Sequence, residues 1–141
     1  MNKVAIVYWS STGNTEKMAK AVFDSVKSKG GEVELFTSGE FSAAKANEFD
    51  KFALGCPSMG NEVLEEGEFD PMYQEIKSSL KGKEVGLFGS YGWGDGEWMR
   101  TWEDDARSAG IDIITDPVIA NYEPNEEVLK KLKVMGELLA D

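Results

Sequence analysis

The sequence predicts a doubly wound α/β fold, with a five-stranded parallel sheet and helices on both faces. Segments with the composition of strands alternate with amphipathic, helix-like segments along the chain. Several strand segments are apolar almost throughout, which is typical of strands covered on both faces of a parallel sheet. The length of 141 residues suits one domain, and no repeat or linker divides it, so we expect a single domain over residues 1–141.

The strand candidates are, in chain order, Val4–Trp9, Val33–Phe36, Lys51–Gly55, Glu84–Ser90 and Ile111–Ala120. Three helices are predicted from apolar residues that share one face at helical spacing. These residues are Met18, Val22 and Val26; Trp98 or Met99, Trp102 and Ala106; and Val128, Leu132, Met135 and Leu139. A further helix is expected to have Pro71 in its first turn and to end at Leu80. Gly30-Gly31 and Gly82 are expected to end elements.

The charge of the chain is one-sided, because 26 acidic and 15 basic residues give a net charge of −11. Such a chain repels nucleic acid and anionic membranes and favours basic protein surfaces as partners. No basic residue lies between Lys51 and Lys77. The acidic residues of that segment are Glu62, Glu65, Glu66, Glu68, Asp70 and Glu75. A surface that only keeps the protein soluble is the alternative explanation of this cluster.

Composition also limits the chemistry. The chain contains no His and one Cys, Cys56, so an internal disulfide is excluded and we expect no metal site and a cytoplasmic location. We expect Cys56 to be a small buried residue rather than a nucleophile. Apolar runs are too short to cross a membrane, and the first strand begins so early that we expect no signal peptide.

The most informative segment is Ser10-Ser11-Thr12-Gly13-Asn14-Thr15, which joins the first strand to the first helix. A turn of this kind aims backbone N–H groups at one point, and the helix dipole favours negative charge there. Hydroxyl groups add donors, and Gly13 allows a close approach of the backbone. No Lys or Arg lies within the segment, so it predicts a phosphate site held by dipoles.

Sequence motifs limit the alternatives to this phosphate site. A polar turn that only caps a helix is one alternative. Neither GxxxxGK[ST] nor GxGxxG occurs, so a nucleoside triphosphatase and an ordinary dinucleotide fold are not supported. A response-regulator receiver would need acidic residues where Ser10 and Gly55-Cys56 stand. A low-molecular-weight phosphatase would need an arginine where Glu62 stands, six positions after Cys56.

Two further loops, Cys56–Glu68 and Tyr91–Glu97, are expected at the same edge of the sheet, since ligands of open parallel sheets bind at the carboxyl ends of the strands. Trp93 lies between two glycines, which suits a loop aromatic that stacks on a ring; a loop anchor folded inward is the alternative. The adaptable thioether of Met59 can cover the other face of the ring. The three loops together would hold a planar ring between Met59 and Trp93 and a phosphate group in Ser10–Thr15. They therefore predict a site for flavin mononucleotide (FMN).

Three motifs together are highly specific: Tyr8–Thr15, Leu54–Glu62 and Leu87–Gly96. Through them the chain resembles the short-chain flavodoxins over its whole length, and most of all the clostridial type. The fifth strand lacks the insertion that marks the long-chain class. The resemblance implies a flavodoxin-like fold with strand order 2-1-3-4-5 and a non-covalently bound FMN.

The resemblance also implies the residues that contact FMN. They are Ser10, Ser11, Thr12, Gly13, Asn14, Thr15, Ser58, Met59, Gly60, Asn61, Glu62, Ser90, Tyr91, Gly92, Trp93, Gly94 and Asp95. Met59 would lie on the inner flavin face and Trp93 on the outer one, while Glu62 would hold the pyrimidine edge. The carbonyl of Gly60-Asn61 would turn toward flavin N5–H when the flavin is reduced. Relatives often have Gly at position 11 and Asp at position 61, where this chain has Ser and Asn.

By this resemblance the chain is expected to be a low-potential one-electron carrier, not an enzyme, shuttling between semiquinone and hydroquinone. The acidic surroundings support a low potential independently, because they disfavour the fully reduced flavin anion. The implied partners are redox enzymes with basic docking surfaces, such as ferredoxin-dependent oxidoreductases and NADP reductases, and we expect a monomer. The alternative is an FMN-dependent quinone reductase on the same fold.

Overall fold

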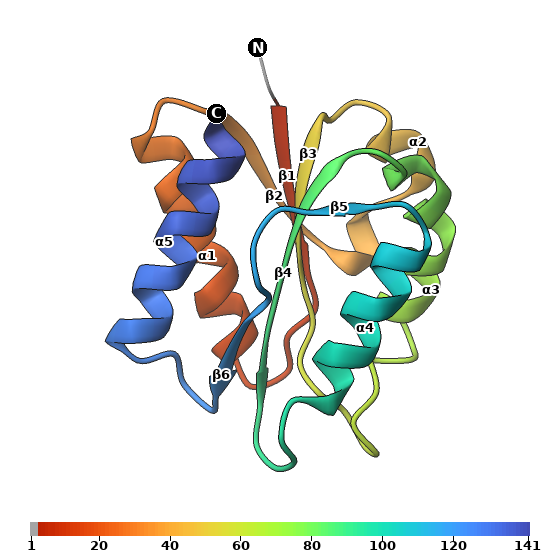
Figure 1. The fold of residues 1–141 in the computed structure, drawn as a ribbon, viewed down its shortest axis with the longest axis vertical. Helices are drawn as coiled ribbons and strands as arrows, with labels where there is room; N and C mark the ends of the chain where they lie inside the picture. Colours follow the sequence, from red (N-terminus) through yellow and green to blue (C-terminus); the bar gives the residue numbers. More distant parts are fainter. Residues whose placement is uncertain (1–2) are drawn as a thin grey trace.

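A parallel sheet forms the middle layer of the computed structural model, which describes residues 3–141 (Figure 1). Its strands are β1 (Lys3–Tyr8), β2 (Glu32–Thr37), β3 (Lys51–Gly55), β4 (Glu84–Tyr91), β5 (Asp112–Ile113) and β6 (Val118–Asn121). The strand order is β2-β1-β3-β4-β5, and β6 also pairs with β4. The predicted order 2-1-3-4-5 and the parallel direction of the strands are therefore confirmed.

Helices cover both faces of the sheet, as predicted (Figure 1). α1 (Asn14–Ser28) and α5 (Glu126–Ala140) lie side by side on one face. α2 (Ala43–Ala46), α3 (Phe69–Ile76) and α4 (Glu97–Ser108) lie on the other. Short 3₁₀ turns precede α2 at Ser38–Glu40 and follow α3 at Lys77–Leu80. Pro71 lies in the first turn of α3, and the segment up to Leu80 continues as one of these 3₁₀ turns. Within the described residues, no helix is both long and apolar enough to span a membrane.

The fifth strand differs from its prediction, because Ile111–Ala120 forms two short strands rather than one. β5 pairs Asp112 with Glu84, whereas β6 pairs Val118 with Phe88. The four residues 114–117 therefore lie opposite only two residues of β4, so the chain must leave the ladder between the two strands. Pro117 contributes to the break because it has no N–H to donate.

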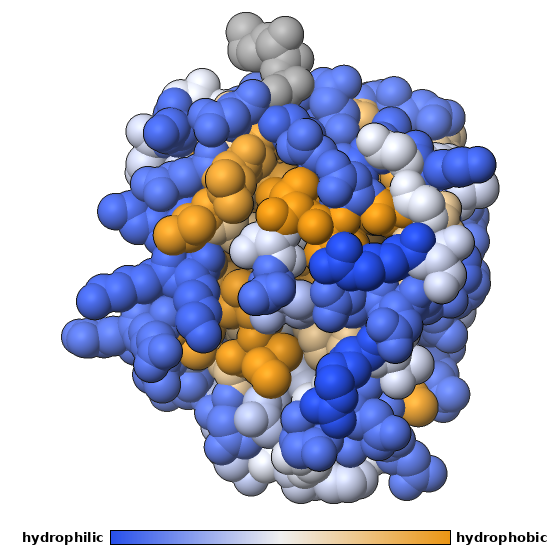
Figure 2. Space-filling view, viewed as in Figure 1, coloured by the Kyte–Doolittle hydropathy of each residue, from blue (hydrophilic) through white to orange (hydrophobic). Residues whose placement is uncertain are grey.

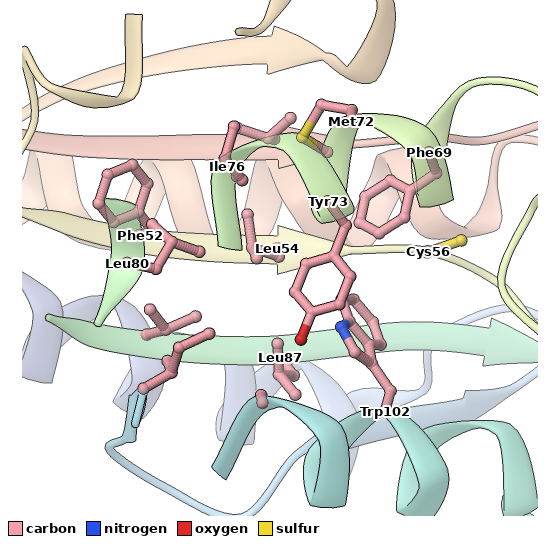
Figure 3. Packing of buried hydrophobic residues seen from close by; sticks show 14 of the residues in the cluster. Phe52, Leu54, Cys56, Phe69, Met72, Tyr73, Ile76, Leu80, Leu87 and Trp102 are labelled. Atoms are coloured by element: carbon pink, nitrogen blue, oxygen red, sulfur yellow. The ribbon is translucent and has the colours of Figure 1, made fainter. Parts of the chain in front are cut away.

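The apolar runs of the strands face two cores. On one face Phe52, Leu54 and Leu87 pack against α3 and α4 through residues such as Tyr73 and Trp102 (Figure 3). On the other face Val4 and Ile6 pack against α1 and α5. The helix faces predicted from the sequence are buried in these cores, apart from Val128, which is partly buried. Viewed from the β5–β6 edge, apolar side chains gather over the middle of the surface and hydrophilic ones surround them (Figure 2).

Candidate functional site

The loop that joins β1 to α1 has the geometry of an anion site. The side chain of Ser10 stabilises the loop, because its Oγ accepts hydrogen bonds from the backbone N–H groups of Gly13 at 3.1 Å and Glu16 at 3.3 Å. Gly13 is the N-cap of α1 and has a left-handed φ of 98°, a conformation that glycine adopts without strain. A Cβ at Gly13 would meet no atom within 4 Å, so the glycine is needed for its φ.

This arrangement leaves the donors of the loop available. Among the described residues, no protein acceptor receives the backbone N–H groups of Ser11, Thr12, Asn14 or Thr15. The nearest lysines are engaged, because Lys17 lies 2.6 Å from Glu123 and Lys20 lies 3.7 Å from Glu16. A phosphate that binds here would therefore meet backbone dipoles and hydroxyl groups at the N-terminus of α1.

The loop that follows β3 carries Gly60-Asn61 at the tip of a small hairpin. Two hydrogen bonds close the hairpin: Met59 N–H donates to Val63 O at 2.8 Å, and Val63 N–H donates to Met59 O at 3.0 Å. Gly60 has a φ of 51° and Glu62 a φ of 56°. Gly60 and Asn61 are exposed at the tip, while the two hydrogen bonds close the base of the hairpin.

The base of this loop is anchored by buried groups. The indole N–H of Trp98 donates to Cys56 O at 3.1 Å, and Ser58 N–H donates to Ser90 O at 2.9 Å. Cys56 is fully buried, its Sγ accepts the Glu65 N–H at 3.3 Å, and burial raises the pKa of its thiol far above the usual range. The side chain of Cys56 therefore packs and is not a nucleophile at neutral pH.

Glu65 fixes the start of α3. Its carboxylate accepts the backbone N–H groups of Gly67, Glu68 and Phe69 at 2.7–2.8 Å. Burial acts to raise the pKa of this carboxyl, but the three N–H donors outweigh it and hold the pKa below its usual value. A carboxyl whose pKa is lowered on folding stabilises the fold above its unfolded pKa, so this anchor is lost only as the pH falls into the acidic range.

Glu62 links the loop after β3 to the loop after β4. Its carboxylate accepts the Glu97 N–H at 3.1 Å, at the N-terminus of α4, where the helix dipole favours an anion. The same carboxylate occupies the space that a Cβ at Gly94 would fill, with Cδ 2.5 Å from that position. Gly94 also has a φ of 89°, so both its conformation and its neighbour require glycine.

The loop after β4 is held from both ends. Arg100 donates to the carbonyl oxygen of Asp95 at 3.0 Å and to its carboxylate at 2.9 Å. Asn121 donates its side-chain amide to the carbonyl oxygens of Tyr91 and Gly92. Trp93, between these anchors, is 64% exposed. The alternative in which Trp93 is an anchor folded inward is wrong.

Residues from all three predicted loops line one pocket at the carboxyl edge of the sheet, at the lower end of the molecule in Figure 1. The lining residues are Ser11, Thr12, Asn14, Pro57, Ser58, Met59, Ser90, Tyr91, Gly92 and Tyr122. Thr15 lies behind this wall, where its hydroxyl is 2.8 Å from that of Ser90. Gly60, Asn61, Glu62, Trp93, Gly94 and Asp95 belong to the same loops but do not line the pocket.

Two residues of the pocket were missed by sequence reasoning, Pro57 and Tyr122. Tyr122 is 62% exposed and has a φ of 61°, a strained conformation for a tyrosine. Its ring lies 3.2 Å from where a Cβ at Gly92 would stand, and its N–H donates to Tyr91 O at 2.8 Å. Its place in the sequence could have identified Tyr122, because it directly follows the last strand and so lies at the same carboxyl edge of the sheet as the three predicted loops.

Comparison with known proteins decides the family. The flavodoxin family model matches residues 6–133. The chain belongs to the flavodoxin family. It is 45% identical over 121 residues to a flavodoxin of Clostridium beijerinckii, covering 86% of this chain and 88% of that protein. It is 41% identical over 129 residues to a flavodoxin of Megasphaera elsdenii, covering 92% and 94%.

The fold agrees with the family. The solution structure of two-electron reduced Megasphaera elsdenii flavodoxin matches with a TM-score of 0.90 at 42% identity and covers 97% of this chain and 98% of that one. Both relatives are of the short-chain, clostridial type, as the resemblance implied. Flavodoxins bind FMN and are electron-transfer proteins rather than enzymes.

The residues of the pocket fit FMN. One side offers unpaired backbone N–H groups and hydroxyls at a helix N-terminus, which are donors suited to a phosphate. The other side offers Met59, Tyr91 and Tyr122, whose apolar and aromatic surfaces suit a planar ring.

Proposed function

We propose that the chain is a low-potential one-electron carrier that holds FMN non-covalently and cycles between the semiquinone and hydroquinone forms. The observation that carries the proposal is the meeting of three loops at one pocket whose phosphate side has only neutral donors. We place the protein in the cytoplasm, as a single domain that acts as a monomer. FMN supplies the redox chemistry, and the chain binds it and adjusts its surroundings.

We assign to these residues the binding roles that the resemblance to the flavodoxins implies. Residues 10–15 hold the phosphate, and Ser58 and residues 90–92 flank the pocket beside it. Met59 covers the inner flavin face, and Trp93 the outer one. Gly60-Asn61 supplies the carbonyl that turns toward flavin N5, and the backbone N–H of Glu62 holds the pyrimidine edge. The carboxylate of Glu62, which accepts the Glu97 N–H, keeps the two ring-binding loops together, with Gly94 and Asp95 shaping the second loop.

A low potential follows from charge. None of the acidic residues between Lys51 and Lys77 forms an ion pair within residues 3–141. Their negative charge next to the hairpin is therefore not neutralised by ion pairs, and Arg100 offsets it in part at Glu62. Adding a second electron to a cofactor in this environment is unfavourable, which lowers the potential of the last reduction step.

Stepwise reduction of the FMN-loaded protein tests the proposal. We expect a blue neutral semiquinone to accumulate before full reduction, and negligible reduction of quinones with a nicotinamide donor. Direct two-electron bleaching with rapid quinone turnover would instead identify the quinone reductase alternative. Absorption spectra recorded during the titration distinguish the two outcomes.

Gly60→Val is expected to lower the stability of the semiquinone more than the affinity for oxidised FMN, because a β-branched residue resists φ near 51° and hinders rotation of the peptide. The matched control is Gly30→Val, since Gly30 also has a positive φ, of 88°, with open space around it, but ends α1. The semiquinone yield and the FMN dissociation constant are the measurements. An equal effect on both quantities in Gly60→Val would contradict a role of this peptide in the redox response.

Tyr122→Asn is expected to weaken FMN binding severalfold while leaving the apoprotein equally stable or more stable, by up to about 1 kcal/mol, because asparagine tolerates left-handed φ. Tyr122→Phe, which keeps the ring, is expected to bind FMN almost as the original chain does. Urea unfolding of the apoprotein and fluorescence titration with FMN measure the two effects. A parallel loss of stability and affinity in Tyr122→Asn would show that the residue only supports the fold.

The proposed partners are redox enzymes with basic docking surfaces, such as ferredoxin-dependent oxidoreductases and NADP reductases. The rate of electron transfer to such an enzyme is expected to fall as salt rises, because steering between opposite charges is screened over about 10 Å at 0.1 M salt. Stopped-flow rates at several ionic strengths measure it. A rate independent of salt would leave the acidic surface with a role in solubility alone.

A further inference from the structure

The loop between β6 and α5 connects two sides of the cofactor site, at the lower end of the molecule in Figure 1. It is tied to the loop after β4, because Tyr122 N–H donates to Tyr91 O at 2.8 Å and the Asn121 amide donates to the same oxygen at 3.3 Å. It is also tied to α1, since the carboxylate of Glu123 lies 2.6 Å from Lys17 Nζ. The loop therefore joins the helix at the phosphate side to the second ring-binding loop, with Tyr122 between the two attachments.

Tyr122 has an unusual backbone conformation for an exposed residue. Its φ of 61° is strained in a tyrosine, although its side chain is exposed and adds nothing to either core. Gly92 leaves the space for the ring, because a Cβ there would lie only 3.2 Å from it. Backbone strain persists where the surrounding structure imposes it, and it is concentrated at functional sites. The fixed position of this ring therefore indicates a role toward a ligand.

The ring of Tyr122 lines the same pocket as the donors of the loop between β1 and α1. The backbone N–H groups of Ser11, Thr12 and Asn14 meet no acceptor within residues 3–141, so they are available to the oxygens of one phosphate group. The volume of the pocket is about 180 Å³, below the roughly 300–1,000 Å³ of pockets that enclose whole ligands. A nucleotide attached to this phosphate would therefore have to leave the pocket past its walls.

The charges beside Tyr122 also disfavour a longer anionic ligand. Flavin adenine dinucleotide (FAD) carries a second phosphate group and an adenosine beyond the phosphate that it shares with FMN. Lys17 is already paired with Glu123, so a second phosphate on this side would have to compete with that carboxylate for the ammonium group. The bulk of the ring and the charges of the loop thus act in the same direction.

We propose that Tyr122 is a specificity-determining residue, whose ring closes the phosphate end of the cofactor site to flavins that carry a nucleotide on their phosphate. FMN ends in a phosphate monoester, which the free donors hold without any group extending beyond them. In FAD the same phosphate is a diester, and the ring of Tyr122 stands in the way of the adenosine diphosphate part. The proposal rests on the FMN site of the proposed function, not on its redox cycle.

Calorimetric titration of the apoprotein with FMN and with FAD tests the proposal. We expect the original chain to bind FAD at least a hundredfold more weakly than FMN. Tyr122→Asn is expected to bind FAD at least fivefold more tightly than the original chain does, while its affinity for FMN falls severalfold. A gain of affinity for the larger ligand cannot come from damage to the fold. Equal affinities of the original chain for the two flavins, or no gain for FAD in Tyr122→Asn, would overturn the proposal.

Two further variants separate selection at the phosphate end from contact with the flavin ring. Tyr122→Phe keeps the aromatic ring and is expected to keep the preference of the original chain for FMN. Trp93→Ala is expected to weaken FMN and FAD by the same factor, because both carry the same flavin. Equal weakening of both in Tyr122→Asn would place Tyr122 against the flavin and refute the selection. Semiquinone yield is measured on the same FMN-loaded samples, so a failure of the carrier function is seen independently of the preference for FMN.

Discussion

Gly89→Ala is expected to lower the free energy of unfolding by about 3 kcal/mol and to weaken FMN binding. Gly89 lies in β4, and a Cβ there would overlap the backbone carbonyl oxygen of Cys56 and approach Trp98 Cζ2 to 3.1 Å. Backbone cannot move aside as a flexible side chain can. The displaced carbonyl is also the acceptor of the Trp98 indole N–H, so a buried hydrogen bond is lost with the packing.

Gly86→Ala is the matched control, because Gly86 lies in the same strand and is also crowded. Its added Cβ would meet the Met135 side chain, with Sδ at 2.7 Å, and a thioether at the end of a flexible chain can shift. Alanine also gains about 0.5–1 kcal/mol over glycine in a strand, so this variant is expected to be nearly neutral. Urea unfolding of both apoproteins and titration with FMN are the measurements.

An equal and small effect of the two substitutions would mean that β3 and β4 adjust freely at Cys56. The loop after β3 would then not be fixed by its base, and its hairpin would have to be ordered by FMN. The predicted difference between the two glycines thus tests whether the ring-binding loop is preorganised by the sheet.

The strands, the helix faces and the polar turn between the first strand and the first helix could be predicted because each depends on neighbouring residues. The apolar run Val4–Trp9, the polar turn after it and the helical spacing that follows lie within a short stretch of chain. The sequence did not predict that Ile111–Ala120 forms two strands. Its composition favours a strand throughout, but the segment must also match the length of the partner strand. Between β5 and β6 the chain has two residues more than the stretch of β4 opposite it, and this difference is visible only once the strands are paired.

Contacts between distant residues were beyond reach from the sequence. The bond from Glu97 N–H to the Glu62 carboxylate spans 35 positions and joins two residues of the same charge. The donor is a backbone N–H group, which every residue except proline has, so no residue type signals the contact. Tyr122 was missed for a different reason, since its loop was not considered although it follows a strand of the same sheet.

Trp93→Ala is expected to weaken FMN binding about tenfold to hundredfold and to raise the flavin fluorescence of the loaded protein. Trp93 is 64% exposed on a glycine-flanked loop, so much of its ring is available to cover a flavin face. Ring stacking contributes about 0.5–1.5 kcal/mol beyond the apolar area that it buries, and each 1.4 kcal/mol corresponds to about tenfold in affinity. The indole also quenches flavin emission by contact, so its removal should brighten the cofactor.

Trp93→Phe is the control, because it keeps an aromatic face and is expected to retain most of the affinity. Unchanged emission in Trp93→Ala would show that the indole does not lie against the ring. In that case Tyr122 becomes the candidate for the outer face, since it is 62% exposed and lines the pocket, which Trp93 does not. Brighter emission in Tyr122→Asn together with unchanged emission in Trp93→Ala would then identify Tyr122 as the side chain that stacks on the flavin, and the opposite result would identify Trp93.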